Sequence, residues 1–210
     1  MKKEIMVLSV FVMTALLSSC VRDPLNDLTE EESRIYITNY DTSVNYRSYS
    51  TFSIADSVAV IRNNQLSARE RTQSDAQFIA AVASALEQRG YTRVAHNQNP
   101  DLGVTISRIV NTATGVVSYT DYGGYYDDYW DPYYWGSPGY SYYFPTYYGV
   151  YQVSEAALSI DILDLKNKAQ NGAIRAIWSG LIRGSGIFRN ENASMQVMAL
   201  FDQSPYLTAQ

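Results

Sequence analysis

AALSIDILDL, residues 156–165, alternates apolar and polar side chains along most of its length. Successive side chains of a β-strand point to opposite faces of the sheet. One face then carries Ala156, Leu158, Ile160 and Ile162, and the other carries Glu155, Ser159 and Asp161. The stretch therefore predicts a strand in a half-covered sheet, with its apolar face under other elements and its polar face toward solvent.

Two nearby segments predict further strands of the same sheet. Leu102, Val104 and Ile106 alternate with small or hydroxyl-bearing residues, which indicates a strand with one apolar face. A hairpin turn over residues 166–172 leads into a return strand, whose apolar positions are Ile174, Ala176, Trp178 and Ile182. The return strand is expected to pair antiparallel with the strand before the turn.

The earlier part of the chain gives weaker patterns. β-prone residues predict a first strand at about residues 42–54. Residues 55–71 mix polar, charged and apolar side chains and predict a loop. Residues 91–94 predict a short strand, followed by a turn over residues 97–100.

Two amphipathic helices complete the predicted domain. Ser74 and Gln77 have the spacing of a capping box, so a helix is expected to begin there and to end at Arg89-Gly90. Residues 191–203 predict a second helix, with Ala193, Val197, Leu200 and Phe201 on one stripe. The element order β-α-β-β-β-α predicts an α+β fold, a two-layer sandwich with a mainly antiparallel sheet and both helices on one face.

Five motifs of this chain together resemble a known family. They are Tyr46-Arg47-Ser48-Tyr49-Ser50-Thr51-Phe52, Leu86-Glu87-Gln88-Arg89-Gly90-Tyr91, Pro100-Asp101-Leu102-Gly103-Val104, Leu158-Ser159-Ile160-Asp161-Ile162-Leu163-Asp164 with Lys166, and Trp178-Ser179-Gly180. Their order is similar to that of the bacterial envelope lipoproteins catalogued as domain of unknown function 4136, over about residues 40–207. The resemblance implies an envelope location and this fold, and it brings no catalytic residue with it.

The N-terminus predicts a lipid anchor. Lys2 and Lys3 precede an apolar run that is too short to span a bilayer, which needs roughly 20 residues. The run ends in Leu17-Ser18-Ser19-Cys20, which resembles the lipobox of bacterial lipoprotein precursors. We therefore expect a signal peptide over residues 1–19, a lipid such as palmitate on Cys20, a tether over residues 20–34 and one domain over residues 35–207.

Composition excludes several classes of function. Without Lys2, Lys3 and Glu4 the chain keeps 14 basic and 20 acidic residues, a formal charge of −6, which disfavours nucleic acids. With its only cysteine lipidated, the mature chain has no disulfide and no thiolate metal site, and we expect no metal or cofactor. Asp is absent directly after Cys20, where many two-membrane bacteria use it for inner-membrane retention. The outer membrane is therefore the expected location.

A tyrosine-rich insert lies between two of the predicted strands. Residues 119–151 contain thirteen tyrosines, two tryptophans, five glycines and three prolines, and no lysine or arginine. Its candidate ligand-binding residues are Tyr125, Tyr126, Trp130, Tyr133, Tyr134 and Trp135, which suit a neutral glycan or an envelope protein. The alternative is that the insert is a spacer. The fold is expected to form without the insert, because the strands before and after it carry their own apolar faces.

Catalysis and metal binding receive little support. His96 is the sole histidine and lies in a predicted turn, and Gly184-Ser185-Gly186 lacks the spacing of a nucleophile elbow. The carboxylates Asp121, Asp127, Asp128 and Asp131 do not fit an EF-hand loop. The sequence thus predicts a lipid-anchored, non-enzymatic binding or assembly-support protein. The alternatives are a hydrolase or carbohydrate-active enzyme using Asp121 and Asp131, and a purely structural lipoprotein that pairs through a sheet edge.

Overall fold

The computed structural model describes residues 28–62, 65–110, 116–117, 135, 151–152, 156–168, 174–189 and 192–209. The chain divides into two units, Met1–Ser33 and Arg34–Gln210. In the described end of the first unit, the amide and hydroxyl of Thr29 donate to the Glu32 carboxylate, both at 2.9 Å. No helix among the described residues is both long and apolar enough to cross a bilayer.

The second unit is built on a mixed sheet of eight strands within the described residues. Six of them lie in the order β1-β10-β9-β6-β2-β5, and β3 and β4 extend the sheet beside β6. Their bounds are β1 Ile35–Tyr40, β2 Thr51–Ile54, β3 Val58–Arg62, β4 Gln65–Glu70, β5 Thr92–Arg93, β6 Leu102–Val110, β9 Ala157–Asp164 and β10 Arg175–Arg183. A separate ladder pairs β7 (Val116–Val117) with β8 (Tyr151–Gln152).

The two strands joined by the predicted turn over residues 166–172, β9 and β10, form the antiparallel pair that the sequence predicts. β9 is antiparallel to both β6 and β10, and β10 is antiparallel to β1. β2 and β3 each join β6 in parallel, at its two ends. The predicted α+β fold, with helices on one face of the sheet, is confirmed.

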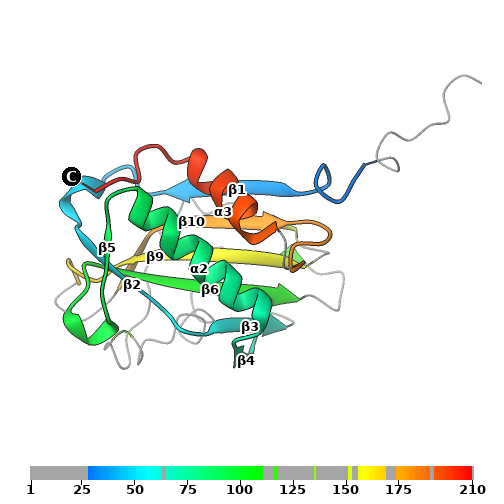
Figure 1. Cartoon of the computed structure of the whole chain (residues 1–210), viewed down its shortest axis with the longest axis horizontal. Coiled ribbons are helices and arrows are strands. Elements are labelled where there is room, and N and C mark those ends of the chain that lie inside the picture. The colour runs from blue at the N-terminus through cyan, green and yellow to red at the C-terminus, as the bar shows by residue number, and fades with distance from the viewer. Residues whose placement is uncertain are drawn as a thin grey trace, which may run out of the picture. The chain divides into compact units, whose positions relative to one another are not determined.

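Two helices cover one face of this sheet, and Figure 1 shows them side by side across it. They are α2 (Gln73–Gln88) and α3 (Ala193–Asp202). Between helices and sheet lies the main core, whose fully buried side chains include Phe52, Phe78, Leu86, Leu158, Ile160, Trp178 and Phe201. Gly180 permits this close packing, because a Cβ there would lie 2.6 Å from the Trp178 ring and 2.9 Å from Leu200.

The start of α2 corrects the predicted capping box. The N-cap is Thr72, whose hydroxyl accepts from Asp75 N, while the Asp75 carboxylate accepts from Thr72 N at 2.8 Å. Ser74 and Gln77 therefore lie inside the helix, in its first turns. A Thr-x-x-Asp pair two residues upstream is the better cap because Asp also complements the positive end of the helix dipole.

The early strands also differ from the prediction. Residues 42–54, predicted as one strand, do not form a single strand. β1 ends before this range at Tyr40, and the range itself contains a 3₁₀ turn at Tyr46–Ser48 and the short strand β2. The loop predicted over residues 55–71 is largely the antiparallel pair β3–β4. β3 reads VAVIR and its first four residues are buried, so its pattern is a continuous apolar run without alternation.

The sheet face opposite the helices, here called the second face, is covered and not solvated. A second cluster of buried residues packs there, including Ala59, Ile61, Ile109, Trp135, Leu163 and Leu181. Ile174 and Ala176 belong to this cluster, whereas Trp178 and Ile182 belong to the main core. The four apolar positions of the predicted return strand therefore divide between the two faces, because the register of β10 shifts between Ala176 and Trp178.

Candidate functional site

The residues predicted to bind a ligand fall mostly outside the described part of the chain. Cys20, Tyr125, Tyr126, Trp130, Tyr133 and Tyr134 lie there, as do Asp121, Asp127, Asp128 and Asp131. Trp135 is described, and it is only 5% exposed. A Cβ added to Gly103 would lie 3.2 Å from its ring, so the indole packs directly on the sheet backbone of β6. Lys168 Nζ donates to Trp135 O at 2.8 Å.

The second face carries a row of buried polar side chains, here called the second-face row. Its members are Thr105, Ser107, Ser159, Asp161 and Ser179, each at most 7% exposed. Asp161 of β9 pairs with Thr105 on β6 and with Ser179 on β10, and Ser107 pairs with Ser159. The row therefore crosses three adjacent strands at the centre of the sheet.

Within the part of the chain that the structure describes, two hydroxyls of this row have no hydrogen-bond partner. Ser159 Oγ donates to Asp161 Oδ2 at 3.0 Å, but Thr105 Oγ1 and Ser107 Oγ are buried without a partner. Leaving a buried hydroxyl unpaired costs about 1–3 kcal/mol. Such a cost is unusual in a structural position, so these hydroxyls mark a candidate site for a polar group.

A different polar network joins the ends of three strands. Tyr49 Oη donates to Asp164 Oδ2 at 2.8 Å, and Asn167 N donates to Asp164 Oδ1 at 2.9 Å. Asp101 Oδ2 accepts from Ser50 N at 2.7 Å. Burial, and then the hydrogen bond to Asp164, raise the pKa of the Tyr49 phenol well above its usual range, so Tyr49 is a neutral donor. These groups satisfy one another, which indicates a structural brace.

A third cluster holds the N-terminus of α2 over the sheet. Arg108 on β6 pairs with Glu70 of β4, and its guanidinium lies 3.7 Å from Asp75 Oδ2. The Arg108 guanidinium also lies 5.8 Å from the ring centroid of Phe188. Within the described residues, no three His, Cys, Asp or Glu side chains are placed to hold a metal ion.

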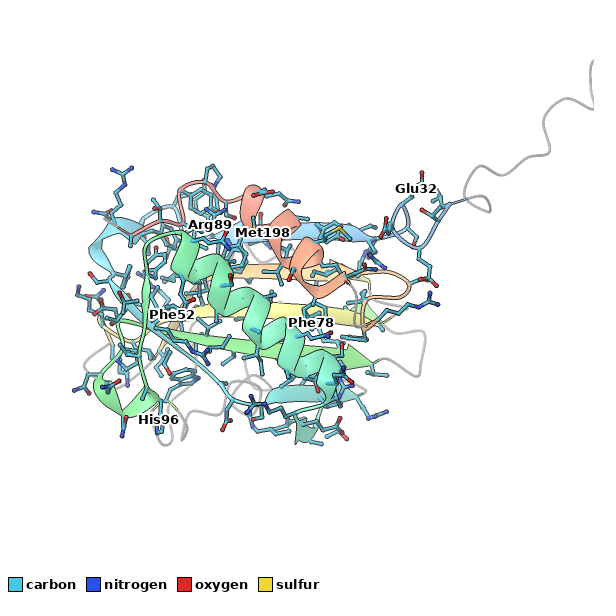
Figure 2. The ribbon with its side chains drawn as sticks, viewed as in Figure 1. Glu32, Phe52, Phe78, Arg89, His96 and Met198 are labelled. Atoms are coloured by element: carbon cyan, nitrogen blue, oxygen red, sulfur yellow. The ribbon has the colours of Figure 1, made fainter. Side chains whose placement is uncertain are left out.

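An exposed edge of the sheet forms the remaining candidate. Among the described strands, β1 is the terminal one beside β10. Its end residues Ile35 and Tyr40 are 42% and 38% exposed, and the four residues between them are partly exposed. α3, which lies next to β1, exposes Met195 and Met198 at 60% and 39%. Figure 2 shows Met198 on this helix, and His96 well away from it, near the turn after β5. Apolar side chains grouped on an exposed surface are typical of interaction sites.

Comparison with known proteins agrees with the fold. The model of the family described as a domain of unknown function (DUF4136) matches residues 37–206. The chain belongs to the DUF4136 family. A crystal structure of a DUF4136 family protein from Bacteroides thetaiotaomicron is 28% identical, with a TM-score of 0.68, and the match covers 84% of this chain and 98% of that one.

Two other solved structures match the chain at lower identity. A PDZ domain protein from Parabacteroides distasonis matches at 16% identity and TM-score 0.46, over 83% of this chain and 36% of that one. A PelC dodecamer from Paraburkholderia phytofirmans matches at 12% identity and TM-score 0.39, over 84% and 99%. No curated protein matches the chain.

The motifs that carry the resemblance to DUF4136 serve the fold. Tyr49, Asp101 and Asp164 belong to the structural brace, and Arg89 donates to three backbone carbonyls after and within α3. Sequence reasoning missed the second-face row as a site, because it read the polar side of β6 and β9 as solvated. The sequence interpretation allowed pairing through a sheet edge but did not identify β1 as that edge, because β1 was not separated from the residues that follow it.

Proposed function

We propose that this DUF4136 protein is a lipid-anchored, non-enzymatic protein of the bacterial cell envelope that binds a partner protein through the β1 edge. Cys20 carries the lipid, and the outer membrane holds the protein. The observation that supports partner binding most directly is the exposed, terminal strand β1 beside exposed Met195 and Met198.

The composition of β1 supports this role. The strand reads IYITNY, with no charge and no proline. Natural edge strands usually carry a charge, a proline or a bulge that blocks pairing with another chain. An edge without these features accepts an added strand, which is a common mode of protein recognition.

The proposal is tested in intact cells with a photo-reactive phenylalanine analogue in place of Tyr40. We expect it to capture a protein partner from the envelope, whereas the same analogue at Arg93, on the opposite edge strand, captures none. Cys20→Ser should abolish labelling with palmitate, release the protein from membranes and remove the captured partner.

A matched control tests whether the lipid requires a cysteine at residue 20 or any exposed cysteine. Adding Ser50→Cys, at an exposed site, to Cys20→Ser restores one cysteine but should restore neither labelling nor membrane retention. Palmitate on Cys20→Ser would contradict the anchor, and equal capture from residues 40 and 93 would contradict the edge as the binding surface.

A second function, binding of a neutral polar ligand such as a glycan, is favoured by the unpartnered hydroxyls of Thr105 and Ser107. The aromatic residues Tyr125, Tyr126, Trp130, Tyr133 and Tyr134 lie between β6 and β9 in sequence and supply the stacking surfaces in this proposal. Replacing unpartnered hydroxyls by apolar groups should leave stability unchanged or raised. Thr105→Val with Ser107→Ala should therefore melt normally and lose binding on a glycan array, and equal binding by both proteins would contradict the site.

A further inference from the structure

The hydrogen bonds of β1 determine which of its backbone groups face the open edge. β1 and β10 pair with Ile35 opposite Arg183 and Tyr40 opposite Trp178. Asp41 N donates to Ile177 O at 2.8 Å, which continues this register by one residue. Residues of an antiparallel pair alternate between bonded and non-bonded positions. Ile35, Ile37 and Asn39 therefore bond to β10, while the amides and carbonyls of Tyr36, Thr38 and Tyr40 point outward. The side chain of Gln203, which follows α3, lies along this edge: its Nε2 donates to Tyr36 O at 3.4 Å, and its Oε1 accepts from Thr38 Oγ1 at 3.3 Å.

We propose that the partner of this edge is the β1 strand of a second copy of the chain, paired antiparallel about a two-fold axis at Thr38. This inference rests on the proposed function, and it identifies the partner protein that binds the β1 edge. In this register Thr38 of one copy faces Thr38 of the other, and Tyr36 faces Tyr40 on both sides of the axis. Thr38 then exchanges both of its backbone hydrogen bonds with its counterpart, and Tyr36 and Tyr40 do so once the exposed Gln203 side chain turns away from Tyr36 O. Tyr36 of each copy lies opposite a Tyr40 whose ring is already held in place by stacking on Tyr206 at 3.9 Å.

Charge at the two ends of β1 favours the antiparallel arrangement. The N-terminal end carries Arg34 and, opposite Ile35, Arg183. The C-terminal end carries Asp41, whose carboxylate pairs with Arg175 at 3.0 Å. An antiparallel pair brings the cationic end of each copy to the neutral end of the other. A parallel pair would place the two cationic ends together, which is unfavourable.

The tether allows both copies to share one membrane. A six-residue strand is about 20 Å long, so the two chains leave the pair roughly that far apart. Residues 20–34 reach on the order of 50 Å when extended, more than enough to bring both Cys20 residues to one bilayer. Strand pairing alone buries less than the roughly 1,200 Å² of a stable interface. We therefore expect a weak dimer that forms on the membrane, where anchoring raises the effective concentration.

One substitution places a thiol on the proposed axis. In Thr38→Cys expressed as the full chain, the two Cα atoms face each other at about 5.5 Å, within disulfide range. We expect mild oxidation of membranes to give a disulfide-linked dimer on a non-reducing gel. The matched control is Thr92→Cys, on the exposed edge strand β5, which should remain monomeric.

The outcomes separate this inference from the proposed function. A dimer formed by the wild-type chain would mean that Cys20 has a free thiol, and would contradict the lipid anchor. No dimer from Thr38→Cys, with a different protein captured at residue 40, would overturn self-pairing while leaving edge binding in place. Thr38→Lys puts two like charges on the axis and should reduce capture of a second copy from residue 40 several-fold, whereas Thr92→Lys should not. Equal capture in both lysine variants would overturn the register.

Discussion

Trp135→Ala is expected to lower the free energy of unfolding by about 3 kcal/mol. The indole is 5% exposed and belongs to the buried cluster of the second face. It packs against Gly103, whose missing side chain leaves room for the ring. Truncating a buried aromatic side chain removes its contacts and leaves a cavity that the surroundings only partly fill. Urea unfolding should show a lower midpoint with an unchanged slope.

Met195→Ala is the matched control, because Met195 is 60% exposed and its loss should change stability by less than about 0.5 kcal/mol. If Trp135→Ala unfolds at the wild-type midpoint, residue 135 belongs to a spacer and the packing on β6 is irrelevant to stability. The result also decides how binding data are read. A ligand assay on a Trp130→Ala, Trp135→Ala pair would mix loss of recognition with loss of folding, so Trp130→Ala alone is the better test of the insert.

The central sheet was predictable because its strands alternate. β6 and β9 each have a polar side and an apolar side, and period-two alternation is a strong local signal. β3 was missed because VAVIR is buried on both faces and shows no alternation. β10 was placed correctly, but the bulge that moves Ala176 to the second face follows from packing against neighbouring strands and leaves no mark in sequence.

The candidate surfaces were less predictable than the fold. Polar residues on one side of β9 normally indicate a solvated face, and only the three-dimensional structure shows that Ser159 and Asp161 are buried. Trp135 lies in a low-complexity segment, and the composition of such a segment does not predict which of its side chains are buried. Which strand lies at an edge depends on which strands assemble beside it, so the terminal position of β1 among the described strands followed from the sheet order alone.

Arg89 is expected to be the most important single charge for stability. Its Nη1 donates to Ser204 O at 2.9 Å and to Leu207 O at 3.3 Å, and its Nη2 donates to Phe201 O. Its guanidinium also lies 5.4 Å from the centroid of the Phe201 ring. The side chain leaves the end of α2 and holds the C-terminal turn of α3 and the segment after it. A cation at this end also complements the helix dipole.

Arg89→Met keeps most of the aliphatic length and removes every donor and the charge. Charged hydrogen bonds contribute about 1.5–3 kcal/mol each and are not additive, so we expect a loss of about 3 kcal/mol. That loss corresponds to a fall in Tm of roughly 6–12 °C for a domain of this size. The Tm of Arg89→Lys should lie between that of the wild type and that of Arg89→Met, since lysine keeps the charge but cannot reach all three carbonyls. Arg93→Met, at an exposed position on β5, is the control and should leave the Tm nearly unchanged.

A second readout separates a local clamp from a general loss of stability. Arg89 O accepts from Ala209 N at 2.9 Å and from Thr208 Oγ1 at 3.1 Å, so the C-terminal residues are tied to the same point. Arg89→Met removes the guanidinium that binds the carbonyls of Phe201, Ser204 and Leu207, which come directly before these C-terminal residues. Limited proteolysis under native conditions should then cut after α3 well before the core unfolds. An Arg89→Met protein that melts like Arg93→Met and resists cleavage there would show that the carbonyls find other partners, and that α3 is held by its apolar face alone.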